Sequence, residues 1–150
     1  MPINECCNMT VVSCEASMPL PEVAALMRGN HVGDVIVVER KENGKIPVGI
    51  ITDRDIVLGT IAVGIEANIF TAGDIMSAPI VTVREDAGLV DTLRLMRSHS
   101  IRRMPVVTDA GTLMAIVTAD DIINLLAMEL SLMTGAIVEQ PINESQRRKS

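Results

Sequence analysis

The chain has 150 residues, a formal net charge of −6 and a pI near 4.8, a size that fits one compact domain or two half-domains sharing a core. Hydrophobic residues make up 48% of it, yet it has one Phe and neither Trp nor Tyr. Nucleic-acid binding needs positive charge for phosphates and rings for base stacking, so we expect no nucleic-acid partner. A planar ligand would lie between aliphatic side chains or against an arginine.

The first half of the chain predicts a strand, a helix, a hairpin and a second helix. A proline in the first helical turn, β-branched runs and an Asn-Gly turn are the local signals. The expected elements are an extended segment at 10–14, a helix beginning near Pro21 and stopped by Gly29 and Asn30, strands at 34–38 and 47–51 around a turn at 41–45, and a helix opening at Thr52 or Asp53.

The second half predicts the same order of elements. The expected elements are an extended segment at 80–83, a helix containing Leu89 and Met96, strands at 104–107 and 113–117, and a final helix from near Ala119 to Leu132 or Met133. We expect the first repeat to span residues 8–60, a connector 61–77 and the second repeat 78–133. The polar tail at 134–150 is predicted to be disordered.

The two halves align residue by residue. Residues 26–28 (Leu-Met-Arg) fall on 95–97 at an offset of 69, and residues 50–56 fall on 116–122 at an offset of 66 after a shorter loop. Two copies are too few for a solenoid, which needs three or more units. The sequence therefore predicts an α+β (α/β-like) fold in which two β-α-β-β-α units, each a small sheet backed by helices, pack about a pseudo-two-fold axis and share a cleft.

Three cysteines (Cys6, Cys7 and Cys14) lie near the N-terminus, without Cys-x-x-Cys spacing or a nearby His. This pattern is typical of ordinary thiols in a reducing cytoplasm, and we expect no metal site. No signal-peptide pattern is visible, and the apolar run at 122–138 is shorter than the ~20 residues of a membrane span. A cytoplasmic protein with no membrane partner is the resulting expectation.

The motif Thr-x-x-Asp occurs at equivalent positions in the two halves, as Thr52 with Asp55 and Thr118 with Asp121. Each motif follows an apolar strand and opens a helix, which is also the pattern of a capping box. Alternatively, the helix N-terminus and the Thr hydroxyl bind phosphate while the Asp accepts hydrogen bonds from a ribose diol. The duplication of the motif favours ligand binding, with capping as the simpler alternative.

The two halves differ in their arginines. Arg102 and Arg103 precede the second central strand, followed by Pro105, while the first half has no counterpart. Guanidinium groups bind phosphate oxygens in a bidentate fashion, and Arg54 inside the first Thr-x-x-Asp could add another. A solvated charge pair is the simpler interpretation. We expect two unequal pockets, at least one of which prefers a phosphorylated nucleoside.

Taken together, Gly-Ile-Ile-Thr-Asp-Arg-Asp-Ile at 49–56 and Ser-Ile-Arg-Arg-Met-Pro-Val-Val at 100–107 resemble the cystathionine-β-synthase (CBS) domain family in a tandem pair, or Bateman module. The resemblance covers residues 8–133. It implies that an adenosine-type ligand binds between the halves, with ribose held by Asp55 and Asp121, and phosphate by Thr52 and Thr118. It also implies that the adenine lies near Val12, Val32, Ile80 and Ile101.

These observations favour a non-catalytic, stand-alone sensor that needs no cofactor and responds to an adenine nucleotide as effector. No nucleophile–base pair or glycine-rich phosphate loop is visible, so we expect no enzyme. The alternative is an assembly module whose Thr-x-x-Asp motifs only cap helices. A homodimer is expected in both cases, since the alternative is ligand-independent homodimerisation or assembly, and a regulated partner protein is expected in the first. AMP, ADP, ATP, NAD and S-adenosylmethionine stay open as ligands, as does the occupancy of one site or both.

Overall fold

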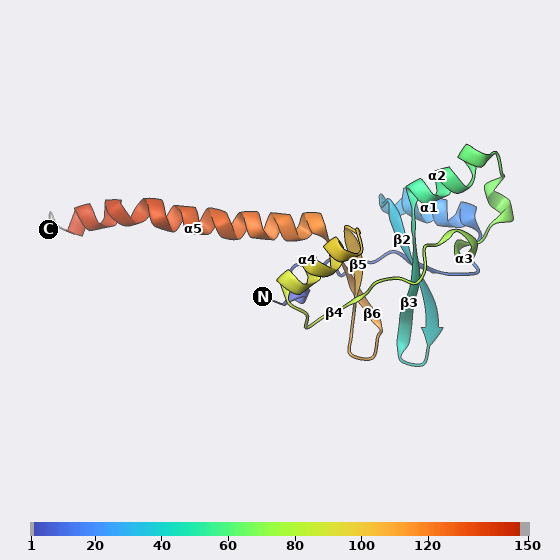
Figure 1. The fold of residues 1–150 in the computed structure, drawn as a ribbon, viewed down its shortest axis with the longest axis horizontal. Helices are drawn as coiled ribbons and strands as arrows, with labels where there is room; N and C mark the ends of the chain where they lie inside the picture. The colour runs from blue at the N-terminus through green and yellow to red at the C-terminus, as the bar shows by residue number, and fades with distance from the viewer. Residues whose placement is uncertain (1, 148–150) are drawn as a thin grey trace.

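The computed structural model describes residues 2–147, with side chains described through residue 136. One order of elements occurs twice along the chain (Figure 1). The first set is β1 (Ser13–Glu15), α1 (Leu20–Asn30), β2 (Asp34–Lys41), β3 (Gly44–Thr52) and α2 (Asp53–Gly59). The second is β4 (Val83–Arg84), α4 (Leu89–Ser98), β5 (Arg103–Val107), β6 (Leu113–Thr118) and α5 (Ala119–Arg147). The remaining short helices are η1 (Ile3–Glu5), η2 (Ile61–Val63), η3 (Ala67–Ile69) and α3 (Ala72–Ile75).

Local sequence signals account for the element ends. Helix α1 carries a proline in its first turn and ends at Asn30, because His31 takes a left-handed conformation with φ 54°. The β2–β3 hairpin turns tightly, with Lys41 opposite Gly44. Gly44 has φ +124°, a conformation that side chains rarely adopt. The predicted elements of both halves are therefore present, and apart from the end of the last helix their boundaries are shifted by a few residues.

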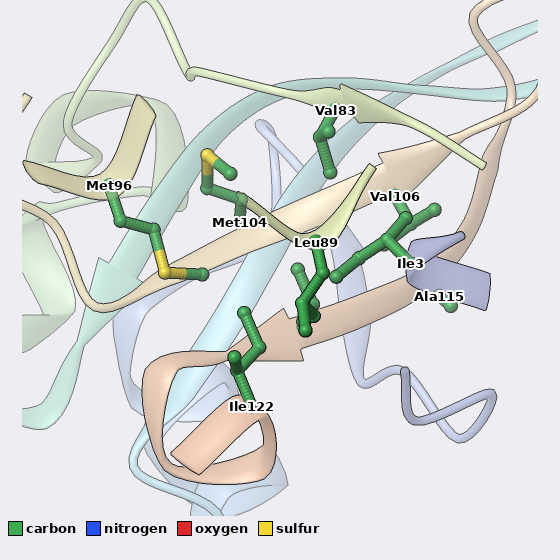
Figure 2. Close-up of a cluster of buried hydrophobic side chains, with 9 residues drawn as sticks. Ile3, Val83, Leu89, Met96, Met104, Val106, Ala115 and Ile122 are labelled. Atoms are coloured by element: carbon green, nitrogen blue, oxygen red, sulfur yellow. The ribbon is translucent and has the colours of Figure 1, made fainter. Parts of the chain in front are cut away.

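Each half forms a three-stranded sheet, in the orders β1-β2-β3 and β4-β5-β6. In each sheet the first pair of strands is parallel and the second antiparallel. Each sheet has its own apolar core against its helices, and Figure 2 shows the core of the second half. The α+β architecture predicted from the sequence is confirmed.

Each half is completed by a segment from outside it. Residue Ile3 is fully buried in the core of the second half, and its N–H donates to the Ala87 carbonyl at 2.9 Å. At the equivalent position of the connector, Ala72 is buried in the core of the first half, and its N–H donates to the Met18 carbonyl at 2.8 Å. The two segments thus exchange places about the pseudo-two-fold axis.

Contacts across the axis obey the same symmetry. Asn8 pairs with Ile116 in an antiparallel bridge, and their equivalents Ser77 and Ile50 form the matching bridge. On the axis itself, equivalent positions meet one another. The Thr112 hydroxyl donates to the Asn43 carbonyl at 3.1 Å, and Arg103 forms an ion pair with Asp34. The offset of 69 found in the sequence therefore corresponds to a real two-fold relation in space.

Gly49 is required by the connector segment packed against it. A Cβ at this position would lie 2.5 Å from the Met76 sulfur and 3.0 Å from the Ser77 carbonyl oxygen. At the equivalent positions of the second half, Ala115 replaces the glycine and Cys7 replaces the methionine. The smaller side chain of Cys7 leaves room for the methyl group of Ala115.

We therefore expect Gly49→Ala to lower the free energy of unfolding by about 1–3 kcal/mol through overpacking. Adding Met76→Cys, which copies the second half, should recover part of that loss. Urea denaturation of the two single variants and the double variant measures the coupling between them. Strictly additive effects would show that Met76 is not the cause of the glycine requirement.

Helix α5 corrects the predicted end of the chain. It continues to Arg147, beyond the end expected at Leu132 or Met133 and through most of the tail predicted to be disordered; residues 148–150 lie outside the described residues. Gly135 costs only about 1 kcal/mol in a helix interior and does not end the helix. Pro141 also lies within α5, although proline lacks a backbone N–H and disfavours a helix interior. Figure 1 shows α5 projecting away from both sheets. Within residues 2–147, no helix combines the length and apolarity needed to cross a membrane.

Candidate functional site: two cavities related by the pseudo-two-fold axis

Two small cavities lie at equivalent places between the halves. One, here called the Asp34 cavity, has a volume of about 140 Å³, and the other, the Arg103 cavity, about 110 Å³. The Asp34 cavity is lined by Asn8, Thr10, Val11, Val12, Val32, Asp34, Ile36, Ile116 and Thr118. The Arg103 cavity is lined by Ile50, Ser77, Pro79, Ile80, Val81, Ile101 and Arg103. Both are lined mainly by aliphatic side chains. A site for a planar ligand is expected to have such walls in this chain, because it contains one Phe and neither Trp nor Tyr.

The halves contribute crosswise to each cavity. The Asp34 cavity combines Val12 and Val32 of the first half with Ile116 and Thr118 of the second. The Arg103 cavity combines Ile80 and Ile101 of the second half with Ile50 of the first. Thr52 lies two residues beyond Ile50 on β3, and residues two apart on a strand share a face. Thr118 therefore lines the Asp34 cavity, and strand alternation puts Thr52 on the same face of β3 as Ile50, which lines the Arg103 cavity.

Both Thr-x-x-Asp motifs form capping boxes. The Thr52 N–H donates to Asp55 Oδ2 at 2.9 Å, and the Asp55 N–H donates to Thr52 Oγ1 at 3.1 Å. In the second half, the corresponding distances for Thr118 and Asp121 are 3.4 and 3.1 Å. The capping alternative is thus correct as a description of these bonds. It does not exclude ligand binding, because each cap engages Oδ2, and Oδ1 of neither Asp has a hydrogen-bond partner within the described residues.

A third Thr-x-x-Asp, which the sequence analysis did not single out, opens α3. The N–H and the hydroxyl of Thr71 donate to Asp74 Oδ2 at 2.8 and 3.0 Å. The hydrogen bond from the Thr71 backbone N–H lowers the pKa of Asp74 most, and the bond from the Thr71 hydroxyl lowers it further. Neither residue lines either cavity. This motif is an internal example of capping without a site and serves as a control for the other two.

The two adjacent arginines have separate partners. Arg103 pairs with Asp34, and the two side chains are 39% and 15% exposed. Arg102 pairs with Asp120 at 2.9 Å, with both side chains over 70% exposed. Exposed pairs of this kind contribute little stability, whereas the partly buried pair between the cavities lies where a ligand would meet it. The structure therefore places Arg103, and not Arg102, on a cavity wall.

The remaining predicted residues lie outside the cavity linings. Pro105 is buried in β5 opposite Ile116. Arg54 is exposed in the first turn of α2, after Thr52. Asp55 and Asp121 stand one turn into their helices, beyond the edge of each cavity.

Several lining residues are not predictable from the sequence. Asn8, Thr10 and Asp34 line one cavity, and their equivalents Ser77, Pro79 and Arg103 line the other. The offset of 69 would have related these positions to one another, but nothing in the local sequence shows that they face a cavity. They come together only because the segment of each half that precedes its first strand crosses to the other half.

Cys6 and Cys7 lie close to the second motif. Burial raises the pKa of both thiols, and the nearby carboxylate of Asp121 raises it further. Burial also raises the pKa of the Cys14 thiol. Thiols of raised pKa carry little thiolate at neutral pH and react slowly. The thiols of Cys6 and Cys7 therefore act as apolar side chains that pack against the core of the second half.

A larger hollow than either cavity lies elsewhere. It measures about 560 Å³ and lies around Glu15, Ala16, Val38 and Arg40. It is shallow and open, and neither Thr-x-x-Asp motif lines it. Size alone would favour it, but the smaller pair of cavities has the aliphatic walls, the polar edges and the two-fold relation, which make that pair the candidate site.

These features define a tandem pair of small domains with one cavity per domain at their interface. The chain belongs to the CBS domain family, whose sequence profile matches residues 4–59 and 72–128. An uncharacterized protein of Methanopyrus kandleri is 36% identical over 123 residues, which are 82% of this chain and 61% of that protein. The chain thus spans about three fifths of that relative's length.

Solved structures show the same fold. A hexameric CBS-CP12 protein from bloom-forming cyanobacteria is 29% identical with a TM-score of 0.71, covering 82% of this chain and 66% of that one. The CBS domain pair of protein MJ0100, solved with 5′-methylthioadenosine and S-adenosyl-L-methionine, is 24% identical with a TM-score of 0.71, covering 84% and 99%. Pairs of CBS domains are regulatory modules.

Proposed function

We propose that this chain is a non-catalytic regulatory module that binds an adenosine-type nucleotide in the cleft between its two halves. The observation that supports this most is the duplicated site, in which aliphatic walls from one half meet a Thr-x-x-Asp motif from the other. The adenosyl ligands of the MJ0100 domain pair support the ligand class. AMP, ADP and ATP are the first candidates, and NAD and S-adenosylmethionine follow.

The cavity volumes suggest which part of such a ligand would lie inside a cavity and which part outside it. Sites that enclose a small molecule measure about 300–1,000 Å³, so a cavity of 110–140 Å³ holds only part of a nucleotide. The flat adenine would enter between the aliphatic side chains. The ribose would then lie at the mouth, within reach of Oδ1 of Asp55 or Asp121, with phosphates toward the Thr hydroxyl and the helix N-terminus.

Regulation would follow from the fact that each cavity is lined by residues of both halves. A ligand that touches both halves favours the arrangement that places its two contact surfaces at the right separation. The ligand shifts the equilibrium between two arrangements of the halves, and the size of the shift is set by the difference between its affinities for them. The regulated protein would recognise a surface that changes with that shift.

A thermal-shift scan against AMP, ADP, ATP, NAD, S-adenosylmethionine and GTP tests the proposal. A ligand that binds only the folded chain stabilises it by about 2.7 kcal/mol at a hundredfold excess over its Kd. We expect an upward shift of the midpoint with at least one adenosine compound and none with GTP. No shift with any adenosine compound, in protein shown to be free of ligand, would favour the assembly module.

We also propose that the chain forms a homodimer through helices α2 and α5. Equivalent apolar residues Val57 and Ile123 are 47% and 56% exposed, and Leu126 on α5 is 45% exposed. Exposed apolar side chains gathered on helices mark association surfaces. We expect sedimentation equilibrium to give a dimer and Val57→Glu with Ile123→Glu to give a monomer. A parent chain that sediments as a monomer at micromolar concentration would contradict this.

A further inference from the structure

Helix α5 continues well beyond the second half and exposes apolar side chains along its length. It has 29 residues, which at 1.5 Å per residue make a rod of about 43 Å. Figure 1 shows it projecting away from both sheets, and Leu130, Leu132 and Met133 are 65%, 72% and 62% exposed. Apolar side chains gathered on one helix in this way mark a surface that another molecule covers.

Four of the exposed apolar residues follow one line along α5 and are here called the α5 stripe. Ile123, Leu126, Leu130 and Met133 are separated by three, four and three residues, which is the heptad spacing of paired helices. Leu132 lies on another side of the helix, because residues one or two apart do not share a helical face. The stripe therefore predicts contact with a second helix along this one line.

We propose that α5 pairs in parallel with α5 of a second copy of this chain along the α5 stripe. This inference rests on the homodimer proposed above and adds the orientation of the two copies, with second half beside second half. Ile123 belongs both to that dimer surface and to the stripe, so the stripe continues the surface outward along α5. Each residue of the stripe lies opposite its own copy, as in any parallel pair of identical helices in register.

The length of the helices favours α5 of the second copy as the occupant. From Ile123 to Met133 the stripe takes about three turns of helix. If the second copy were reversed, with its first half beside α5, the stripe would face α2, the equivalent helix, which has seven residues. That is about two turns, too few to cover the stripe. A second α5 covers it completely and continues beyond it.

The charge beside the stripe favours the parallel direction. Glu129 is the one charged residue between Ile123 and Met133. In a parallel pair, the position just before Leu130 faces the position just after Met133 of the other helix, which is the uncharged Thr134. In an antiparallel pair, Glu129 would face Glu129 of the second copy. Like charges at such flanking positions oppose association, so the parallel pair is the more stable one.

Cysteine cross-linking tests this orientation. Leu126→Cys and Met133→Cys, one heptad apart, should each give a disulfide-linked dimer under mild oxidation. Leu132→Cys is the matched control, similarly exposed but on another side of the helix, and should stay unlinked. The parent chain should also stay unlinked, because its three cysteines are buried or half-buried.

Each other pattern of links would overturn the proposal. An antiparallel pair links at most one of the two positions, because its helices bring a residue opposite its own copy at one point only. A reversed dimer links neither position. Linking at Leu132→Cys as strongly as at Met133→Cys would show that the contact is not confined to the stripe.

Charged substitutions test whether the stripe stabilises the dimer. Leu130→Glu with Met133→Glu should raise the Kd of the dimer by about tenfold or more in sedimentation equilibrium, whereas Leu132→Glu should leave it nearly unchanged. Circular dichroism checks that each variant is folded, and the high exposure of these side chains makes the substitutions compatible with folding. The same Kd in both variants would overturn the proposal.

The outcomes also separate this inference from the proposals before it. A parent chain that sediments as a dimer but gives no links at Leu126→Cys and Met133→Cys refutes the parallel pair and leaves the homodimer standing. A parent chain that is monomeric at micromolar concentration refutes both. Nucleotide binding is judged separately in the thermal-shift scan, since no residue of the stripe lines either cavity.

Discussion

An Ile3→Ala variant is expected to unfold with a free energy about 2–5 kcal/mol lower than that of the parent chain. Terminal residues usually fray and tolerate substitution, so this is a large effect for the third residue. The reason is that Ile3 is fully buried in the core of the second half (Figure 2). Its removal leaves a cavity among Leu89, Val106 and their neighbours.

Urea denaturation measures this loss, and Ile61→Ala provides the matched control. Ile61 is the same residue type at 78% exposure, so its truncation should change stability by only a few tenths of a kcal/mol. If Ile3→Ala costs no more than Ile61→Ala, the N-terminal segment does not contribute to the core of the second half. The exchange of segments between the halves would then have no energetic role.

Replacing Asp55 and Asp121, the ribose ligands of the proposed function, by asparagine is expected to weaken nucleotide binding by more than about tenfold with little loss of stability. Asparagine keeps one oxygen for the cap to the Thr52 or Thr118 N–H but loses the charge and the second acceptor. Alanine at the same positions would also remove the cap, at about 1 kcal/mol each, and would mix the two effects. Asp55→Asn and Asp121→Asn therefore isolate the ligand contribution.

Asp74→Asn is the control for this experiment, because Asp74 caps α3 in the same way and lines neither cavity. Its affinity for the ligand found in the thermal-shift scan should equal that of the parent chain. Titration calorimetry compares the three variants. If Asp55→Asn and Asp121→Asn both bind as tightly as Asp74→Asn, the motifs are helix caps alone and the assembly module becomes the better hypothesis.

The candidate site was predictable only in part. The Thr-x-x-Asp motifs were visible in the sequence because a cap is a local arrangement of four residues, and Val12, Val32, Ile80 and Ile101 were implied by family resemblance. The placement of Asn8, Thr10 and Asp34 was not visible. Their contacts join residues about 70–110 positions apart, such as Asn8 with Ile116 and Asp34 with Arg103, and no local pattern encodes such a pairing.

The error at the C-terminal end has a related cause. Polarity after Gly135 suggested disorder, whereas α5 continues to Arg147. Composition indicates whether a segment can bury apolar surface. It does not account for helix propagation, in which residues added to an existing helix need no new nucleus, so a helix can continue through residues that would not start a helix on their own. The prediction treated the tail as an independent segment and neglected its attachment to a helix.

What the sequence by itself determined is the order of the elements, most of their ends and their duplication, because caps, turns and hydrophobic spacing act between neighbours a few residues apart. The tertiary structure decided the rest. It sent Ile3 into the second core and Ala72 into the first, and it brought Asp34 and Arg103 together on the axis. These outcomes depend on how two similar surfaces bury each other, a property of the packed pair and of neither half alone.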